Sequence, residues 1–169
     1  DPVAQGENGE MVVDKYVYSP KEKSSASCAM KFASGLFRVV TGKIATVNPE
    51  RFKVQTRMAT IGIRGCEVGF LLDEEREDVY ILWLPTGKSI LVERTGAAGM
   101  SSPDLPALND MLTIIQAGTA VSISEGARLN ERAITSLEMT DFYRNLLIDS
   151  TVPSGQPASG QGGTVPSPP

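Results

Sequence analysis

The stretch FKVQTRMATIGIRG, residues 52–65, decides the fold class of this chain. In each half of the stretch apolar and polar residues alternate, which is the period of a β-strand with one buried face. The apolar positions are Phe52, Val54, Ala59, Ile61 and Ile63. The stretch therefore predicts two successive strands that each turn one face toward a hydrophobic core.

The chain that follows shows the same short apolar segments, separated by turn residues. Residues 79–84 and 89–93 flank Pro85-Thr86-Gly87-Lys88, where proline presets the turn torsion and glycine accepts a positive φ. We expect a β-hairpin there and a last short strand at 120–124. The acidic run 73–78 lacks the ligand spacing of a calcium loop, so it predicts a solvated loop between strands.

A helical pattern replaces the strand pattern near residue 135. Thr135 and Glu138 have the spacing of a capping box, and an apolar stripe of helical period follows. The stripe consists of Met139, Phe142, Tyr143, Leu146 and Leu147. It fits a helix that closes off the β core, and it also fits a docking face for a partner. Residues 98–115 are ambiguous, with a loop before a run compatible with a short helix.

The composition argues against several classes of function. Lysine and arginine number 16 against 20 aspartate and glutamate residues, so there is no basic surface for nucleic acid or anionic lipid. The chain has no histidine, the usual general base and the commonest nitrogen ligand of metals. Carboxylates such as Asp73 and Glu75 lie in a charged loop without a nucleophile beside them. We expect a non-catalytic protein without a cofactor or metal, and the sequence gives no sign of a small-molecule ligand.

The apolar runs and the two ends of the chain indicate where the protein is located. No apolar run approaches the ~20 residues that cross a bilayer, so no membrane-spanning segment is predicted. The chain begins at Asp1, which fits a mature exported protein and equally fits a trimmed one. Residues 150–169 are rich in Gly, Ser and Pro and have too little apolar surface to fold alone. They predict an extended tail or linker, with candidate partner-binding positions at Val152, Pro153, Val165 and Pro166.

This pattern divides the chain into four parts. We expect an N-terminal extension at residues 1–10, a β domain at 11–130, a C-terminal amphipathic helix at 131–149 and the tail at 150–169. The predicted fold class is all-β with one helix.

The segment KFASGLFRVVTGKIATVNPERFKVQTRMATIGIRGCEV, residues 31–68, resembles the FecR domain of exported bacterial proteins. It matches that family in its glycine-aromatic-arginine segment, its Asn-Pro turn and its Ala-Thr-Ile-Gly-Ile-Arg-Gly signature. The signature positions are Gly35, Gly42, Thr60, Gly62, Arg64 and Gly65. The resemblance is strong over residues 11–70 and weaker to 123. It implies an irregular, partly solenoid- or sandwich-like β domain with no known catalytic residues.

Two positions depart from the family pattern, and two glycines within it have a physical interpretation. Arg57 replaces the family's proline, and Cys66 replaces its threonine. Cys28 lies on the strand that leads into the signature, so it and Cys66 are candidates for a disulfide across neighbouring strands, although two buried thiols fit equally. Gly62 and Gly65 allow close backbone approach or positive φ. Arg64 between them is better suited to bracing a turn than to binding an anion.

The family resemblance implies two alternative roles, of which the first is a module of secreted or surface-attached proteins that serves structure or adhesion. The tail makes this role more specific: lying along an exposed sheet edge of a neighbour, it predicts a subunit that associates with copies of itself or with the cell surface and builds a filament. The alternative is a periplasmic sensor of the anti-sigma type that binds a receptor domain. Both predict a protein partner, and both predict export.

Overall fold

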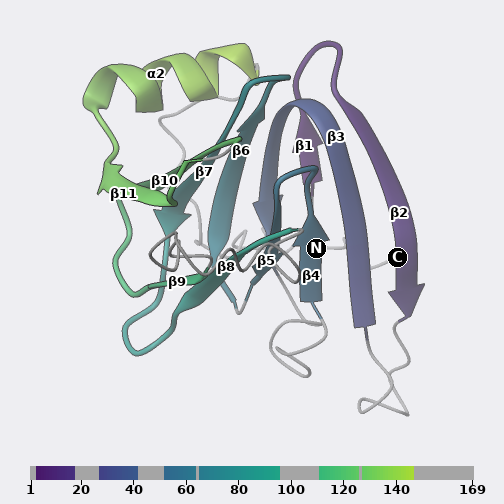
Figure 1. The fold of residues 1–169 in the computed structure, drawn as a ribbon, viewed down its shortest axis with the longest axis horizontal. Coiled ribbons are helices and arrows are strands. Elements are labelled where there is room, and N and C mark those ends of the chain that lie inside the picture. Colours follow the sequence, from purple (N-terminus) through teal and green to yellow (C-terminus); the bar gives the residue numbers. More distant parts are fainter. Residues whose placement is uncertain are drawn as a thin grey trace, which may run out of the picture.

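The structure is a computed structural model that describes residues 3–17, 27–41, 52–63, 65–95, 111–125 and 127–146 (Figure 1). These residues form strands and one helix. The strands are β1 (Val3–Gln5), β2 (Glu10–Val17), β3 (Ser27–Val40), β4 (Phe52–Gln55), β5 (Ala59–Gly62), β6 (Glu67–Leu72), β7 (Arg76–Trp83), β8 (Ile90–Arg94), β9 (Met111–Ile114), β10 (Thr119–Ser124) and β11 (Asn130–Ala133). The helix is α2 (Ser136–Asn145). The prediction of a mostly β fold with a C-terminal helix is confirmed.

Strand β3 belongs to both halves of the sheet. Its first half pairs with β2 and β4, and its second half pairs with β1 and β6. The change of partners falls at Gly35, whose φ is +107°. A Cβ atom at Gly35 would lie 2.5 Å from the Cα atom of Gly9, so only glycine fits this position without a backbone shift. Figure 1 shows β3 curving over, with the β1–β2 segment arching beside it.

The strands extend from β3 in two directions. We call the series β11-β10-β7-β6-β3-β1 sheet A and the series β9-β8-β5-β4-β3-β2 sheet B. Neighbouring strands are antiparallel except for β3 and β4, which are parallel. The whole sheet curls into a half-barrel, so that sheets A and B face one another (Figure 1).

The core fills the space between the two sheets. Phe32 and Phe37 come from the two halves of β3 and stack with their ring centroids 4.2 Å apart, while Phe70 of β6 meets Phe32 edge-on. All five apolar positions of the 52–65 stretch are fully buried in the same cluster, which confirms the predicted one-faced strands. Burial of each phenylalanine, valine or isoleucine side chain among them stabilises the fold by roughly 1.5–3 kcal/mol.

The predicted hairpin around Pro85 is wrong, although its turn is correct. The Lys88 N–H donates to the Pro85 carbonyl over 3.1 Å, and Gly87 has a φ of +75°. However, β7 pairs with β6 and β10 in sheet A, whereas β8 pairs with β5 and β9 in sheet B. The chain therefore crosses from one sheet to the other at this turn.

The predicted loop at 73–78 is also shorter than expected. Strand β7 begins at Arg76, and only Asp73 to Glu75 form the turn. Glu77 and Asp78 are 1% and 4% exposed rather than solvated. Glu77 accepts hydrogen bonds from the Thr56 hydroxyl and the Met58 N–H, and its burial raises its pKa.

Three further boundaries differ from those expected. Val3 to Gln5 lie within the predicted N-terminal extension but form β1, which pairs with β3. Residues 130–133 form β11, so the helix begins at Ser136 instead of 131. Within the ambiguous 98–115 segment, Met111 to Ile114 form β9, and residues 98–110 lie outside the described residues.

Helix α2 packs on the outer face of sheet A instead of closing the core. The capping box of Thr135 and Glu138 is present, as predicted. Phe142 and Leu146 form a separate small cluster with Leu36, Tyr80 and Ala120.

Gly69 of β6 is where the helix approaches the sheet most closely. A Cβ atom there would lie 2.4 Å from the Phe142 ring, so the missing side chain leaves room for that ring. We predict that Gly69→Ala lowers the free energy of unfolding by about 1–3 kcal/mol, because the ring and its helix must shift. Urea denaturation measures this value.

The matched control is Gly62→Ala. Its new Cβ would lie 3.8 Å from Leu91 Cβ, an ordinary contact, and its φ is not positive. This change should alter stability by less than about 0.5 kcal/mol. Equal losses for the two variants would contradict the proposed close packing at Gly69.

Candidate functional site

Helix α2 covers only part of the outer face of sheet A. The strand register aligns Tyr80 with Gly69, and the ring of Phe142 lies over Gly69. In the next cross-strand row, Asp78 lies beside Leu71, and Leu71 lies beside Leu36. Leu71 is 40% exposed.

A groove follows this second row along the side of α2. It consists of two hollows of about 340 and 410 Å³ that share Leu36, Leu71 and Asn145 as lining residues. Its other lining residues are Glu7, Gly35, Asp73, Arg76, Asp78, Tyr80, Glu138, Asp141, Phe142 and Arg144. The floor is thus largely apolar, and the walls carry mostly acidic groups.

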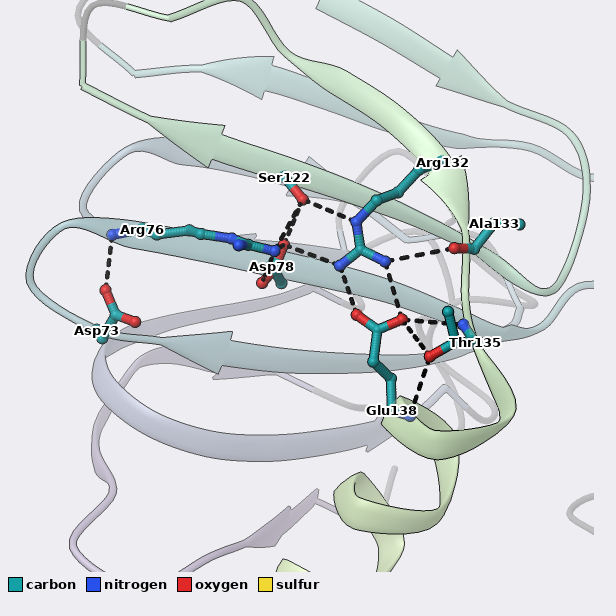
Figure 2. Close-up of polar contacts among 8 residues, drawn as sticks. All are labelled: Asp73, Arg76, Asp78, Ser122, Arg132, Ala133, Thr135 and Glu138. Atoms are coloured by element: carbon teal, nitrogen blue, oxygen red, sulfur yellow. Dashed lines mark hydrogen bonds and ion pairs between the residues drawn. The ribbon is translucent and has the colours of Figure 1, made fainter.

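A polar network forms one end of the groove (Figure 2). Arg132 of β11 pairs with Glu138 of α2 over 2.7 Å and lies 3.5 Å from Asp78 of β7. Asp78 also pairs with Arg76 over 2.8 Å and accepts a hydrogen bond from the Ser122 hydroxyl. The network therefore ties the first turn of the helix to three strands of sheet A.

Glu138 is the residue that joins this network to the helix cap. It accepts the Thr135 N–H over 2.9 Å, and its own N–H donates to the Thr135 hydroxyl over 3.2 Å. The bond from Arg132 is the main cause that lowers the pKa of Glu138 to about 2, with the Thr135 N–H as a further cause. The ionised form is therefore favoured where it caps the helix.

A second buried contact fixes the helix further along. Glu67 of β6 accepts hydrogen bonds from Arg38 Nε over 2.7 Å and from the Tyr143 hydroxyl over 2.9 Å. Burial, and then the nearby Glu67 charge, raise the pKa of Tyr143, so the phenol stays protonated as the donor. These contacts position the helix and leave the groove beside it open.

Strand β2 is a second exposed apolar feature of the described residues. Within the described residues it pairs on one side only, with β3, and none of its residues is buried. Four large apolar side chains are 37–57% exposed, namely Val12, Val13, Tyr16 and Val17. Val13 and Tyr16 lie opposite Met30 and Cys28 of the core and yet remain accessible. An open strand edge with apolar side chains is a template for adding another strand.

The FecR-like signature positions prove to have different roles. Gly35 and Gly65 have positive φ values of +107° and +75°. Gly62 sits within β5 with neither positive φ nor a close approach, so that expectation is wrong for Gly62. Thr60 lies in β5 opposite Gln55 and Glu93. The other two signature positions, Gly42 and Arg64, lie outside the described residues, as do the candidate partner-binding positions of the tail, Val152, Pro153, Val165 and Pro166.

Arg57, which stands where the family has proline, makes a contact between turns. Its guanidinium donates to the carbonyls of Asp73 and Glu74, so it links the β4–β5 turn to the β6–β7 turn. The side chain thus braces the β4–β5 turn through hydrogen bonds to another part of the fold.

The two cysteines do not face one another across neighbouring strands. Cys28 pairs with Tyr16 and Phe52, whereas Cys66 is bonded through its backbone to Thr41 beyond the far end of β3. Both are buried in the same core cluster, with no disulfide between them in the structure. Burial raises the pKa of Cys28. A disulfide between them stays a prediction.

The groove and its polar network were not predicted from the sequence. One local signal was available, since Arg76, Asp78 and Tyr80 alternate with the next strand residues and so share one face of β7. No such signal connects them with Leu36 or Glu138, which are more than thirty residues away in either direction. These contacts depend on the strand order.

Comparisons with known proteins give a distant likeness in fold. No family model matches the chain, and no curated protein matches it. Two crystal structures of a "putative anti-sigma factor" from Parabacteroides distasonis, at 2.50 and 1.65 Å, align with TM-scores of 0.47 at 11% and 10% identity. The alignments cover 82% of this chain and 62% and 63% of those proteins, so the chain spans less than two thirds of their length.

No helix of the described residues is long and apolar enough to cross a bilayer. Among the same residues, no group of three or more cysteine, aspartate or glutamate side chains is arranged to hold a metal ion.

The pairing of Arg132 with Glu138 predicts how stability depends on pH. Because the pKa of Glu138 falls from 4.5 to about 2 on folding, its contribution is present above about pH 4.5 and is lost as the pH falls toward 2. Glu138→Gln should lower the free energy of unfolding at neutral pH by about 1 kcal/mol and flatten this part of the pH profile. Thermal unfolding across the acidic range measures both effects.

Asp141→Asn provides the control for this prediction. Asp141 pairs with Arg144 on the exposed side of the same helix over 2.9 Å. Its loss should change stability by less than about 0.5 kcal/mol, as for other exposed pairs. An equal effect of both substitutions would show that the cap network adds nothing beyond surface charge.

Proposed function

We propose that this chain is an exported, non-catalytic protein-binding module of the FecR-like, anti-sigma type. In this proposal, β2 receives an extended strand of a partner such as a receptor domain. The observation that carries it is the open edge of β2, with its exposed Val12, Val13, Tyr16 and Val17. The resemblance of residues 31–68 to the FecR domain supports the signalling class and the export.

The energetics of strand addition fit the composition of β2. Added main-chain hydrogen bonds supply affinity, and side chains on alternate positions supply specificity. Val13 and Tyr16 extend the core face of sheet B, so a partner strand that covers them buries apolar surface next to the core. Tyrosine is also enriched among residues that dominate binding energy.

The charges of β2 restrict the registers in which a second copy could pair with it. In a regular symmetric antiparallel pair, the twofold axis passes through a residue that faces its own mate. An axis at Asp14 or at Lys15 opposes like charges, which is destabilising, whereas an axis at Val13 opposes none. A second copy is therefore the competing occupant of this edge, and the crosslinking experiment below distinguishes it from a different protein.

The non-catalytic part of the proposal is supported by the buried carboxylates. Glu67 bonds to Arg38 and Tyr143, Glu77 bonds to the Thr56–Met58 turn, and Asp78 bonds to Ser122 of β10. Each of these groups joins separate elements of the fold. Filament formation through the 150–169 tail remains the alternative, and that tail lies outside the described residues.

Crosslinking from β2 tests this function. A photo-reactive benzoylphenylalanine at Tyr16, in cells that export the chain, should crosslink a distinct protein, which mass spectrometry identifies. With that protein purified, Val13→Lys should weaken binding roughly tenfold, because a charge replaces a side chain buried by the added strand. Isothermal calorimetry measures the dissociation constant.

The control position for both steps is Leu137, an apolar residue of α2 that is also exposed. Crosslinks from Leu137 to the same protein, or equal weakening by Leu137→Lys, would refute binding at β2. Crosslinks from Tyr16 only to further copies of the chain would instead support self-association.

A further inference from the structure

We infer that the groove beside α2 is a second binding site, which takes an extended basic segment of a partner protein. The segment would place an apolar side chain on Leu71 and its cationic side chains against the acidic walls. This site is separate from β2, and the inference does not depend on the proposed function.

The floor of the groove is apolar, and Leu71 is the part of it that the fold leaves uncovered. Leu36 is the direct neighbour of Leu71 across β3 and β6, and Phe142 borders both from the helix; these two side chains are buried. Leu71 remains 40% exposed because α2 packs over the neighbouring row at Gly69. An apolar side chain laid on Leu71 would remove this surface from water.

The walls of the groove carry an excess of negative charge. Its lining contains five acidic residues, Glu7, Asp73, Asp78, Glu138 and Asp141, against the basic residues Arg76 and Arg144. Asp78, Glu138 and Asp141 are paired with arginines, Arg132 among them, so the excess negative charge rests mainly on Glu7 and Asp73. Asp73 Oδ1 accepts the backbone N–H groups of Glu75 and Arg76, contacts that leave its negative charge in place. The groove therefore complements a cationic ligand.

The dimensions of the groove favour a peptide segment. The groove crosses β7, β6 and β3 and ends at Glu7, which lies in the segment between β1 and β2. Strands lie about 4.8 Å apart, so this path is roughly 14 Å long and matches about four residues of extended chain. Helix α2 forms one long wall of the groove. Its residues on that wall follow one another at helical spacing, namely Glu138, Asp141, Phe142 and Asn145.

Lysine and arginine suit both parts of this surface. Their aliphatic stems pack on apolar floors while the charged ends reach acidic groups at the rim. A segment that alternates leucine with arginine or lysine would therefore set leucine on Leu71 and a cation near Asp73 or Asp141. An acidic segment would be repelled by the same walls.

Fluorescence anisotropy with the labelled peptide GSLRLKLSG tests the inference on the full chain. Leu71→Ser should weaken binding roughly tenfold, the size expected for a central apolar contact. The double variant Asp73→Asn with Asp141→Asn should weaken it roughly three- to tenfold at low salt. Asparagine at 73 keeps the oxygen that accepts the turn hydrogen bonds, so the fold is retained.

Two control peptides and one control variant separate the groove from other surfaces. The acidic peptide GSLELELSG should not bind, and GSSRSKSSG should bind much more weakly because it lacks leucine. Tyr16→Ser in β2 should leave the affinity for GSLRLKLSG unchanged. The inference is overturned if the groove variants bind the peptide as the unaltered chain does, or if the leucine-free basic peptide binds equally, since that indicates general charge attraction.

Discussion

The bend of β3 at Gly35 is the constraint on which the rest of the structure depends. A single strand can serve two facing sheets only if its backbone turns sharply, and the positive φ of Gly35 provides that turn. The backbone of Gly9, in the segment between β1 and β2, lies so close to Gly35 that a side chain at Gly35 has no room. The stacked rings of Phe32 and Phe37 on either side of the bend then start the core. The open β2 edge is the outer border of this same arch.

The attachment of α2 follows from a different requirement, which is the need to cover the outer face of sheet A. The helix lies where that face has no side chain, at Gly69, and Phe142 occupies the space. Arg132 with Glu138 at one end and Glu67 with Tyr143 further along hold it there. Because the helix follows the row with glycine, the row with Leu71 stays uncovered. The groove is thus a consequence of how the helix is packed.

Charged groups inside this protein mainly connect elements of the fold. Glu77 joins the β4–β5 turn of sheet B to β7 of sheet A, and Asp78 joins β7 to β10 and β11. Such groups are stable when buried only because each has hydrogen-bond or charge partners. The exposed apolar residues of β2 have no comparable structural role, and this contrast is the reason to assign binding to β2.

The sequence by itself determined the local structure. Its alternating residues specified β4 and β5 with their buried faces, Thr135 and Glu138 specified the helix start, and Pro85 with Gly87 specified a turn. These features depend on neighbours within a few residues. Only the tertiary structure decided that β7 and β8 part at that turn, that Cys28 and Cys66 lie toward opposite ends of β3, and that Asp78 is buried. Strand pairing joins residues far apart in the chain, and the alternation within one strand does not identify its partner.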